Sequence, residues 1–504
     1  MSIAMVVWLL SVGVTTLLLI IVAKTNRFLR LLSEAALGVA IAGLPFAWVA
    51  FGHIFLAILA LILHIWLVIL PARLLMGRLE HQFLLQSTWQ NASIIAFLCA
   101  GLALAGQWQT LALVRYAIIL GLIACIIVGV YFLGQLWWNT RRYKIPAPMG
   151  QQKLKDLPTV SVCIAARNED HALADCLASV LASDYPKLEV LVLDDCSQDK
   201  TPGIIGTFAH DGVRFIQGDV PATGWLGKNQ AQQTLAKQAS GDYLLFMDVD
   251  THLGVTSISQ VIAYALAQRL QMVGVLPQNR LGVQPATLFG TLAYFWRLAM
   301  PISKTSVPVS TNCWLVRAVS LQQLGSFASV SRKIVPETSF AARLAVHNQY
   351  RFLVSDATLG ITTAKRWSSQ IETATRVLYP SQRRQPLRTL AVCCVEFGMC
   401  LAPPILIMVR LVQQTNDVIL WLSLAASALF LFNYYLVLLR VQPNSWLLAG
   451  LCWPIVVLQE VTLHIGSMLQ YEFSDVNWKG RNVCYPVLAP RPPQELPQPS
   501  FGRR

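Results

Sequence analysis

The chain has 504 residues, of which 55% are hydrophobic and only 13% are charged, and its formal net charge is +14. This composition excludes an ordinary soluble enzyme of this length, because such proteins carry about 25% charged residues. The positive charge lies beside apolar stretches and no nucleic-acid-binding motif occurs, so we interpret it as attraction to an anionic membrane surface and exclude nucleic acid as a partner.

The first part of the chain, residues 1–150, is predicted to be a membrane region. A membrane-spanning helix needs about 20 apolar residues, and five stretches come close to this length: 3–23, 34–51, 54–72, 92–108 and 116–137. Basic residues follow the first, third and fifth stretches, as they do at the cytoplasmic ends of membrane spans. We therefore predict a multi-pass plasma-membrane protein with an outside N-terminus and a cytoplasmic soluble domain.

Short β-rich runs alternate with helical stretches from Val160 onward, which predicts an α/β domain over residues 151–388. Such alternation is typical of a mostly parallel sheet, whose ligands bind beyond the carboxyl ends of the strands. The predicted strands are 160–165, 189–195, 213–216, 243–247 and 272–276. The first predicted helix follows the first strand and ends near residue 182. The other three predicted helices cover roughly 200–209, 228–239 and 255–268.

Polar residues follow three of these strands, where the strands would meet at one edge of the sheet. They are Arg167, Asn168 and Glu169 after the first strand, Asp194 and Asp195 after the second, and Asp248 and Asp250 after the fourth. An aspartate after a strand is often only a helix cap or a turn residue. Three clusters at the same edge favour a binding site.

The segment YLLFMDVD (243–250) ends in two aspartates separated by one residue. Residues i and i+2 of an extended chain point to the same side, so the two carboxylates repel each other unless a cation lies between them. Mg²⁺ and Mn²⁺ prefer oxygen ligands and often bind one or two carboxylates together with substrate phosphate oxygens. We therefore predict that Asp248 and Asp250 hold Mg²⁺ or Mn²⁺ against a diphosphate.

A second membrane region of two or three helices is predicted over residues 389–470, with apolar stretches at 389–410, 418–439 and 446–469. Three spans would place the tail (residues 471–504, basic and Pro-rich) outside the cell, against the charge rule, so one stretch could instead lie in the membrane interface. The basic segment 371–388 is predicted to lie on the membrane surface. The eleven cysteines show no spacing typical of zinc sites or disulfide frameworks.

Several segments, in order, resemble membrane-bound family-2 inverting glycosyltransferases with the GT-A fold, and most of all the lipid-modifying ceramide, hopanoid and carotenoid glycosyltransferases. They are IAARNED (164–170), VLDDCSQDKT (192–201), GWLGKNQA (224–231), DVD (248–250), CWLVRAVSLQQLGSF (313–327) and WKGR (478–481). The resemblance covers roughly residues 158–367 and part of the tail. It implies a Rossmann-like GT-A domain inserted between transmembrane helical regions.

The resemblance also implies ligands and residue roles. The donor would be a nucleotide sugar, with a UDP-sugar favoured over a GDP-sugar, and the acceptor a lipid of the bilayer. The implied nucleotide-sugar residues are Ala166, Arg167, Glu169, Asp194, Asp195, Lys228 and Asp248, and the implied metal ligands are Asp248 and Asp250. Lys228 could instead be a solvated residue at the start of a helix.

The expected catalytic base departs from the family pattern. Relatives carry Glu-Asp before a short helix and use the Asp as base, whereas this chain has PETSFAARL (336–344). Aligning the helices places Glu337 at the position of the base, with Pro336 before it. Glutamate can act as a general base, although an acid at this position is also favoured by the helix dipole alone.

The expected acceptor motif departs as well. Many relatives carry Gln-x-x-Arg-Trp, and this chain has TAKRW (363–367), in which Thr363 replaces the Gln. The resemblance places Arg366 and Trp367 at the acceptor, although both are also common anchors of a membrane-surface helix. The missing Gln disfavours a processive polysaccharide synthase.

The sequence therefore predicts an inverting glycosyltransferase that moves a sugar from a nucleotide sugar to a membrane lipid. Two alternatives stay open: a processive polysaccharide synthase with its own membrane channel, and a catalytically degenerate membrane protein that still binds nucleotide. A transporter would leave the α/β domain unexplained. The sequence leaves the sugar, the lipid and the oligomeric state open.

Overall fold

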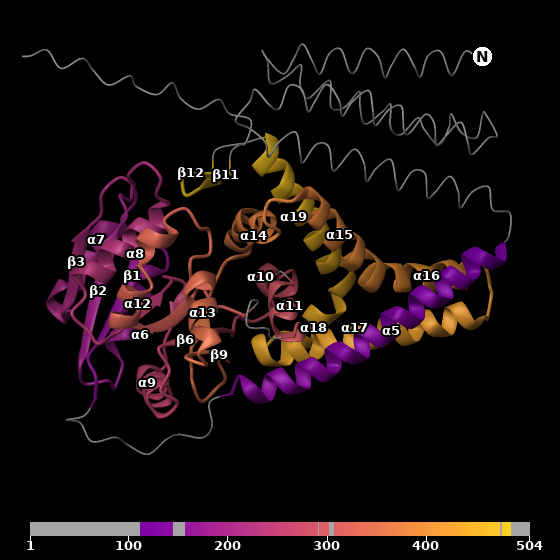
Figure 1. The fold of residues 1–504 in the computed structure, drawn as a ribbon, viewed down its shortest axis with the longest axis horizontal. Helices are drawn as coiled ribbons and strands as arrows, with labels where there is room; N and C mark the ends of the chain where they lie inside the picture. The colour runs from indigo at the N-terminus through magenta and orange to yellow at the C-terminus, as the bar shows by residue number, and fades with distance from the viewer. Residues whose placement is uncertain (1–110, 145–156, 291, 302–306, 474–475, 485–504) are drawn as a thin grey trace, which may run out of the picture.

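The computed structural model describes residues 111–144, 157–290, 292–301, 307–473 and 476–484. Within these ranges an α/β domain lies beside a group of long helices (Figure 1). The first four predicted spans, 3–23, 34–51, 54–72 and 92–108, fall outside the described residues.

The α/β domain contains a seven-stranded sheet with the order β3-β2-β1-β4-β8-β6-β9. Only β8 runs antiparallel to its neighbours, so the predicted mostly parallel sheet is confirmed. The strand order reverses between β1 and β4, and in such sheets ligands bind at this point of reversal. The strands are β1 (Val160–Ala166), β2 (Leu188–Asp194), β3 (Val213–Gln217), β4 (Tyr243–Met247), β6 (Met272–Leu276), β8 (Cys313–Arg317) and β9 (Tyr350–Val354).

Helices cover both faces of this sheet because its central strands are apolar on both sides. In β4, for example, Leu245 and Met247 pack into one core while Leu244 and Phe246 pack into the other. The first core receives α6 (Leu173–Leu181), α7 (Thr201–Thr207) and α9 (Ser257–Ala267). The second receives α8 (Gly227–Gln238), α12 (Ala318–Gln323) and α13 (Glu337–Val346). The helices predicted from the sequence in this region are confirmed.

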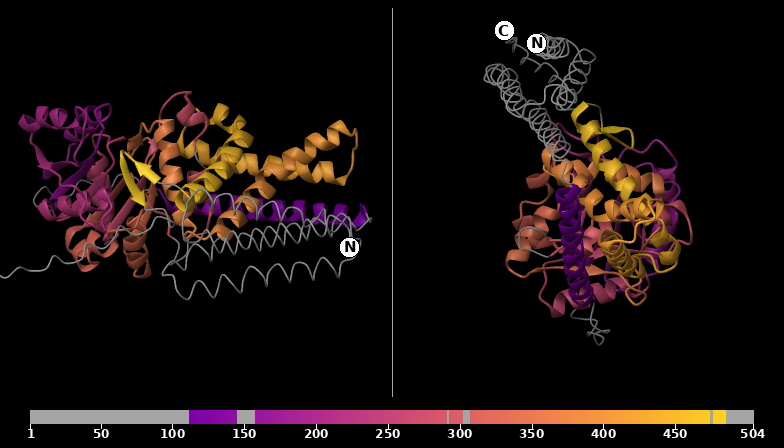
Figure 2. Two further views of the ribbon diagram at one scale, coloured as in Figure 1. Left: turned by 90° about the horizontal axis from the view of Figure 1, so that it is seen from above. Right: turned by 90° about the vertical axis from the view of Figure 1, so that its right-hand side faces the viewer.

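Three helices within the described ranges are long and apolar enough to cross a membrane: Arg115–Arg142, Pro386–Val412 and Val418–Val441. They coincide with the apolar stretches predicted at 116–137, 389–410 and 418–439, which are therefore helical and long enough to span a membrane. The first lies within α5 (Leu111–Arg142), and the third is α17 (Val418–Val441). The second consists of α15 (Pro386–Glu396), a π-helical turn and α16 (Ala402–Val412). Figure 2 shows α5, α16 and α17 projecting together from the α/β domain.

The last predicted span, 446–469, is not among these three. It divides at Cys452 into α18 (Trp446–Leu451) and α19 (Trp453–Phe473), because Pro454 lacks the backbone N–H that a continuous helix would need there. The side chain of Glu460 is buried in α19. The helix packs along α14 (Trp367–Ser381) and α15 on one side, and it exposes Ile455, Leu458 and Leu469 on another.

Short elements connect the two parts of the molecule. A small sheet of β5 (Thr251–His252), β10 (Thr362–Thr363) and β7 (Gln278–Asn279) lies beyond the end of β4. The helices α10 (Pro285–Leu288) and α11 (Ala293–Ala299) lie among the long helices, and the hairpin of β11 (Val476–Trp478) and β12 (Arg481–Cys484) lies beside α14 (Figure 1). The core that holds α8 and α13 also contains residues of α5, α17 and α19, so one apolar core joins the sheet to the long helices.

Asn139 connects α5 to the end of α11. Its buried Nδ2 donates hydrogen bonds to the carbonyls of Leu298 (2.8 Å) and Met300 (3.1 Å). Asn139→Ala removes both donors, so we expect the free energy of unfolding to fall by about 1–3 kcal/mol. Thermal unfolding of the detergent-purified protein measures this loss. Thr140→Ala, which removes only a local hydrogen bond, is the control, and equal stability of the two variants would contradict the expectation.

Candidate active site

Two cavities meet beyond the carboxyl ends of β1 and β4. The first has a volume of about 220 Å³ and lies among the strand ends, α14 and the β11–β12 hairpin. The second has a volume of about 120 Å³ and lies among α11, α13, α14 and α19. Six residues line both cavities and define their junction: Lys228, Asp248, Lys365, Thr373, Arg376 and Trp478.

Most of the residues that the sequence singled out lie in the first cavity. These are Ala166, Arg167, Glu169, Asp195, Lys228, Asp248, Asp250 and Arg366. Glu337 lines the second cavity. Asp194 and Trp367 line neither. The structure thus brings the strand-end clusters together, as expected for the edge of a parallel sheet.

The two aspartates at the end of β2 have different surroundings. The buried carboxylate of Asp194 accepts hydrogen bonds from the backbone N–H of Ser197 (3.2 Å) and from Nε2 of Gln217 (3.3 Å), so it holds the turn that follows the strand. The carboxylate of Asp195 faces the first cavity and forms an ion pair with Arg481 at 2.6 Å. Of this pair, only Asp195 is placed to contact a ligand directly.

The β11–β12 hairpin closes one side of the first cavity through ion pairs. Arg481 binds Asp195, and Lys479 binds Glu169. Arg167 donates from Nε to the carbonyl of Lys479 (3.0 Å) and from Nη1 to the carbonyl of Asp195 (2.6 Å), which ties the hairpin to the ends of β1 and β2. The WKGR motif therefore belongs to the wall of this cavity.

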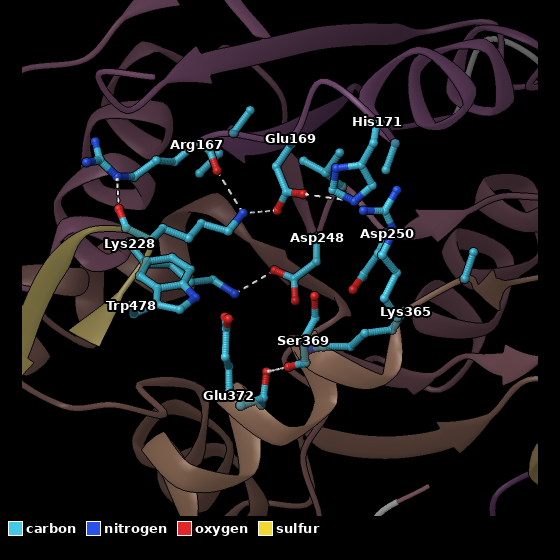
Figure 3. Close-up of a pocket in the computed structure, with 18 of the residues that line it drawn as sticks. Arg167, Glu169, His171, Lys228, Asp248, Asp250, Lys365, Ser369, Glu372 and Trp478 are labelled. Carbon is cyan, nitrogen blue, oxygen red and sulfur yellow. Dashed lines mark hydrogen bonds and ion pairs between the residues drawn. The ribbon is translucent and has the colours of Figure 1, made fainter. Parts of the chain in front are cut away.

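The Asp248 and Asp250 carboxylates face the first cavity near Glu169 (Figure 3). Oδ1 of Asp250 is buried without a hydrogen-bond partner among the described residues, and burial together with the neighbouring carboxylates raises the pKa of Asp250. Burial also acts to raise the pKa of Asp248, but Lys228 at 2.5 Å and Lys365 outweigh it and lower the pKa. A partly buried carboxylate pair with one buried, unpaired oxygen fits a divalent cation.

No group of three His, Cys, Asp or Glu side chains is placed to hold a metal ion in the described part of the chain. A cation at Asp248 and Asp250 would therefore take its remaining ligands from substrate and water, as Mg²⁺ often does. Lys228 is not the solvated residue of the alternative interpretation, because its side chain is only 22% exposed and reaches into the junction (Figure 3).

Glu337 is the first residue of α13 and is 1% exposed. Both of its carboxylate oxygens are buried and have no hydrogen-bond partner in the ranges that the structure describes. Burial raises the pKa of Glu337 to about 7, although the charge of Lys228 opposes the shift. A carboxyl group that titrates near neutral pH can accept a proton from a substrate hydroxyl.

Arg366 and Trp367 do not line the cavity that holds Glu337. Arg366 lines the first cavity at the start of α14. The side chain of Trp367 is 42% exposed and lies beside the ring of Phe289, with 6.4 Å between the ring centroids. Thr363, at the position of the missing Gln, is buried in β10.

Two residues at the junction, Arg376 and Trp478, have no role predicted from the sequence. The guanidinium of Arg376 lies over the ring of Trp478, 4.5 Å from its centroid. Nε of Arg376 is buried and has no hydrogen-bond partner among the described residues. Arg376 belongs to the segment expected on the membrane surface, but α14 buries Ala374 and Tyr379 and forms a wall of both cavities.

Known proteins resemble this chain in its central part. The profile of the family described as Glycosyl transferase family 2 matches residues 161–306. A beta-monoglucosyldiacylglycerol synthase of Trichormus variabilis is 27% identical over 153 residues, which is 30% of this chain and 31% of that protein. An N-acetylglucosaminyltransferase of a Bradyrhizobium species is 36% identical over 109 residues, 21% of this chain and 69% of that protein.

Among solved structures, a mannosyltransferase from Pyrobaculum calidifontis in complex with GDP-Man and Mn²⁺ superposes with a TM-score of 0.42 and 15% identity. That superposition covers 70% of this chain and 97% of the other.

Proposed function

We propose that this chain, which belongs to glycosyltransferase family 2, transfers one sugar from a UDP-sugar to a hydroxyl group of a membrane lipid, with inversion at the anomeric carbon. The observation that carries this proposal is the junction of the two cavities. The first cavity holds the carboxylate pair Asp248 and Asp250, and the second holds the buried, unpaired carboxyl group of Glu337.

The first cavity suits the nucleotide sugar. Its strand-end residues, including Ala166, Arg167, Glu169 and Asp195, would contact the nucleotide. Asp248 and Asp250 would hold Mg²⁺ or Mn²⁺, which neutralises charge on a departing diphosphate when it is bound. Lys228 and Arg376 lie at the junction, where cationic groups stabilise the negative charge that develops on the leaving diphosphate.

The second cavity suits the acceptor. Its walls include α11, which packs against α5 and α17, and α19, which packs against α15. The third wall, α14, packs along α19. Glu337 would remove the proton of the acceptor hydroxyl, whose oxygen then bonds to the anomeric carbon from the face opposite the diphosphate. The bond from that carbon to the diphosphate oxygen breaks, UDP leaves, and the proton stays on Glu337. This displacement passes through an oxocarbenium-like transition state, as glycoside chemistry does in general.

The name of the T. variabilis relative supports a lipid acceptor, since that protein is called a beta-monoglucosyldiacylglycerol synthase. Three helices apolar enough to span a membrane, counted within the described ranges, support a membrane location. The proposal also includes an α/β domain that spans residues 151–388 and lies on the cytoplasmic side of the membrane. It further includes contact of Arg366 and Trp367 with the acceptor. For Arg366 and Trp367, contact with an acceptor would occur outside the second cavity.

The rate of transfer is expected to rise with pH. Glu337 must be ionised to accept a proton, and its pKa is raised to about 7. The value of kcat/KM should therefore climb from about pH 6, pass half of its plateau near pH 7, and level off above about pH 8. UDP release by the purified enzyme, measured across this range, tests the profile. A rate that is flat or falls across this range would contradict a basic role for Glu337.

The proposal itself is tested by UDP release from a panel of UDP-sugars, with and without a membrane lipid extract. The detergent-purified full chain should release UDP from at least one sugar, and the lipid extract should stimulate that release. GDP-sugars serve as the comparison for the nucleotide. Binding of UDP without release from any UDP-sugar would favour the catalytically degenerate alternative and contradict the proposal.

A further inference from the structure

The short helix α11 presents an arginine to the second cavity. Ala293, Tyr294 and Arg297 line this cavity and share one side of the helix, as residues three and four apart do. The other side, with Phe295 and Leu298, is buried in the core against α5 and α17. The orientation of Arg297 therefore follows from the apolar packing of the same helix.

The helix is also fixed at both ends, so the position of Arg297 is well defined. At the start, the backbone N–H of Leu292 donates a hydrogen bond of 3.2 Å to Oε2 of Glu460 in α19. At the end, Asn139 of α5 binds the carbonyls of Leu298 and Met300.

Arg297 has no hydrogen bond and no ion pair with any residue that the structure describes. Burial lowers the pKa of Arg297, yet an arginine stays charged in proteins. Its side chain is partly buried in the wall of the cavity, and a charge that is partly removed from water is costly unless it is paired. The unpaired guanidinium of Arg297 is therefore suited to bind the anionic group of a ligand that enters the cavity.

The other charged groups of the second cavity do not supply that anion. Its cations are Lys228, Arg297, Lys365 and Arg376, and its carboxylates are Asp248, Glu337 and Glu460. Asp248 is paired with Lys228, and Glu460 accepts the hydrogen bond from α11. Glu337 faces the same cavity but lies beyond ion-pair distance of Arg297, and burial raises its pKa to about 7. Positive charge is in excess, four cations to three carboxylates.

Arg297 differs from the other three cations in its position. Lys228, Lys365 and Arg376 line both cavities and so face the diphosphate of the donor. Arg297 lines only the second cavity, which is on the acceptor side of the junction. We propose that Arg297 binds a phosphate group of the acceptor, so that the acceptor is a lipid with both a phosphate and a free hydroxyl group. This inference rests on the proposed function and specifies its acceptor.

The test is the binding of short-chain lipids to the full-length enzyme in detergent with UDP and Mn²⁺ present. Dioctanoyl-phosphatidylglycerol carries a phosphate and free hydroxyl groups, whereas dioctanoylglycerol carries only the hydroxyl. We expect the wild type to bind the phosphatidylglycerol more tightly, and Arg297→Gln to weaken this binding by about 10- to 100-fold, the range of a charge-assisted hydrogen bond. Arg297→Lys, which keeps the charge, should lose less.

Two controls separate the outcomes. Arg317→Gln removes an exposed arginine at the end of β8, outside both cavities, and should leave lipid binding unchanged, so an equal loss there would overturn the inference. Equal binding of the two lipids by a wild type that binds UDP would overturn the inference alone. Failure of the wild type to bind UDP would overturn the proposed function as well.

A last arm compares UDP-glucose with UDP-glucuronic acid, because a carboxylate on the donor sugar is the other anion that could reach Arg297. Arg297→Gln should not change the ratio of these two affinities. A selective loss of UDP-glucuronic acid binding would assign Arg297 to the donor and overturn the inference.

Discussion

Replacement of Glu337 by glutamine is expected to lower the rate of sugar transfer by about 10²- to 10⁴-fold, the usual contribution of a general base. Glutamine has nearly the same shape as glutamate but cannot accept the proton of the acceptor hydroxyl. UDP binding should persist, because Glu337 lines only the second cavity. Steady-state UDP release and UDP calorimetry on the same preparation separate these two effects.

The stability of this variant should not fall. The oxygens of Glu337 have no hydrogen bonds with the described residues, so the neutral amide removes no bond, and its burial costs less than burial of a charge. Glu337→Asp is the matched control, because aspartate keeps a carboxylate that can accept a proton, and it should retain more activity than Glu337→Gln. Activity of Glu337→Gln within a few-fold of the wild type would mean that Glu337 only interacts with the helix dipole of α13.

Replacement of Asp250 by asparagine is expected to weaken metal-dependent UDP binding by about 100-fold. Loss of a residue that merely supports a metal ligand already costs about 10- to 100-fold in affinity, and Oδ1 of Asp250 is the free buried oxygen of the carboxylate pair. Calorimetry of UDP with Mn²⁺ and with EDTA measures the metal-dependent part.

Asp211→Asn is the control for this substitution. Asp211 is an exposed residue of the 3₁₀ turn before β3 and lines neither cavity. It should leave the Mn²⁺ dependence of UDP binding intact. If Asp250→Asn kept the same dependence as this control, the Asp-x-Asp segment would be only the end of a strand.

The sheet could be predicted because its strands are buried on both faces and end in polar clusters. The run from Tyr243 to Met247 is apolar throughout and is followed directly by Asp248 and Asp250. The ends of parallel strands meet at one edge, so the sequence alone placed these aspartates near Asp195 and Glu169. The proposed metal ligands and the proposed base each come from a short local motif, DVD (248–250) and PETSFAARL (336–344).

The rest of the site depends on contacts between segments far apart in the chain. The ion pair of Lys479 with Glu169 joins residues 310 positions apart, and no local pattern indicates it. Asp194 and Asp195 are adjacent and chemically identical, and only the turn at Ser197 decides which of them faces the cavity. Arg376 is one of several arginines in a basic segment, and only the packing of α14 turns it inward.

The proposed transfer of a single sugar to a membrane lipid is best tested by measuring the mass of the product. The full-length enzyme is incubated with the UDP-sugar that supports UDP release, Mn²⁺ and a membrane lipid extract, and the lipids are then analysed by mass spectrometry. We expect a lipid whose mass has increased by one sugar residue, and we expect this lipid to be absent from a parallel reaction with Glu337→Gln. A polymer of many sugars, or free sugar without any modified lipid, would contradict it.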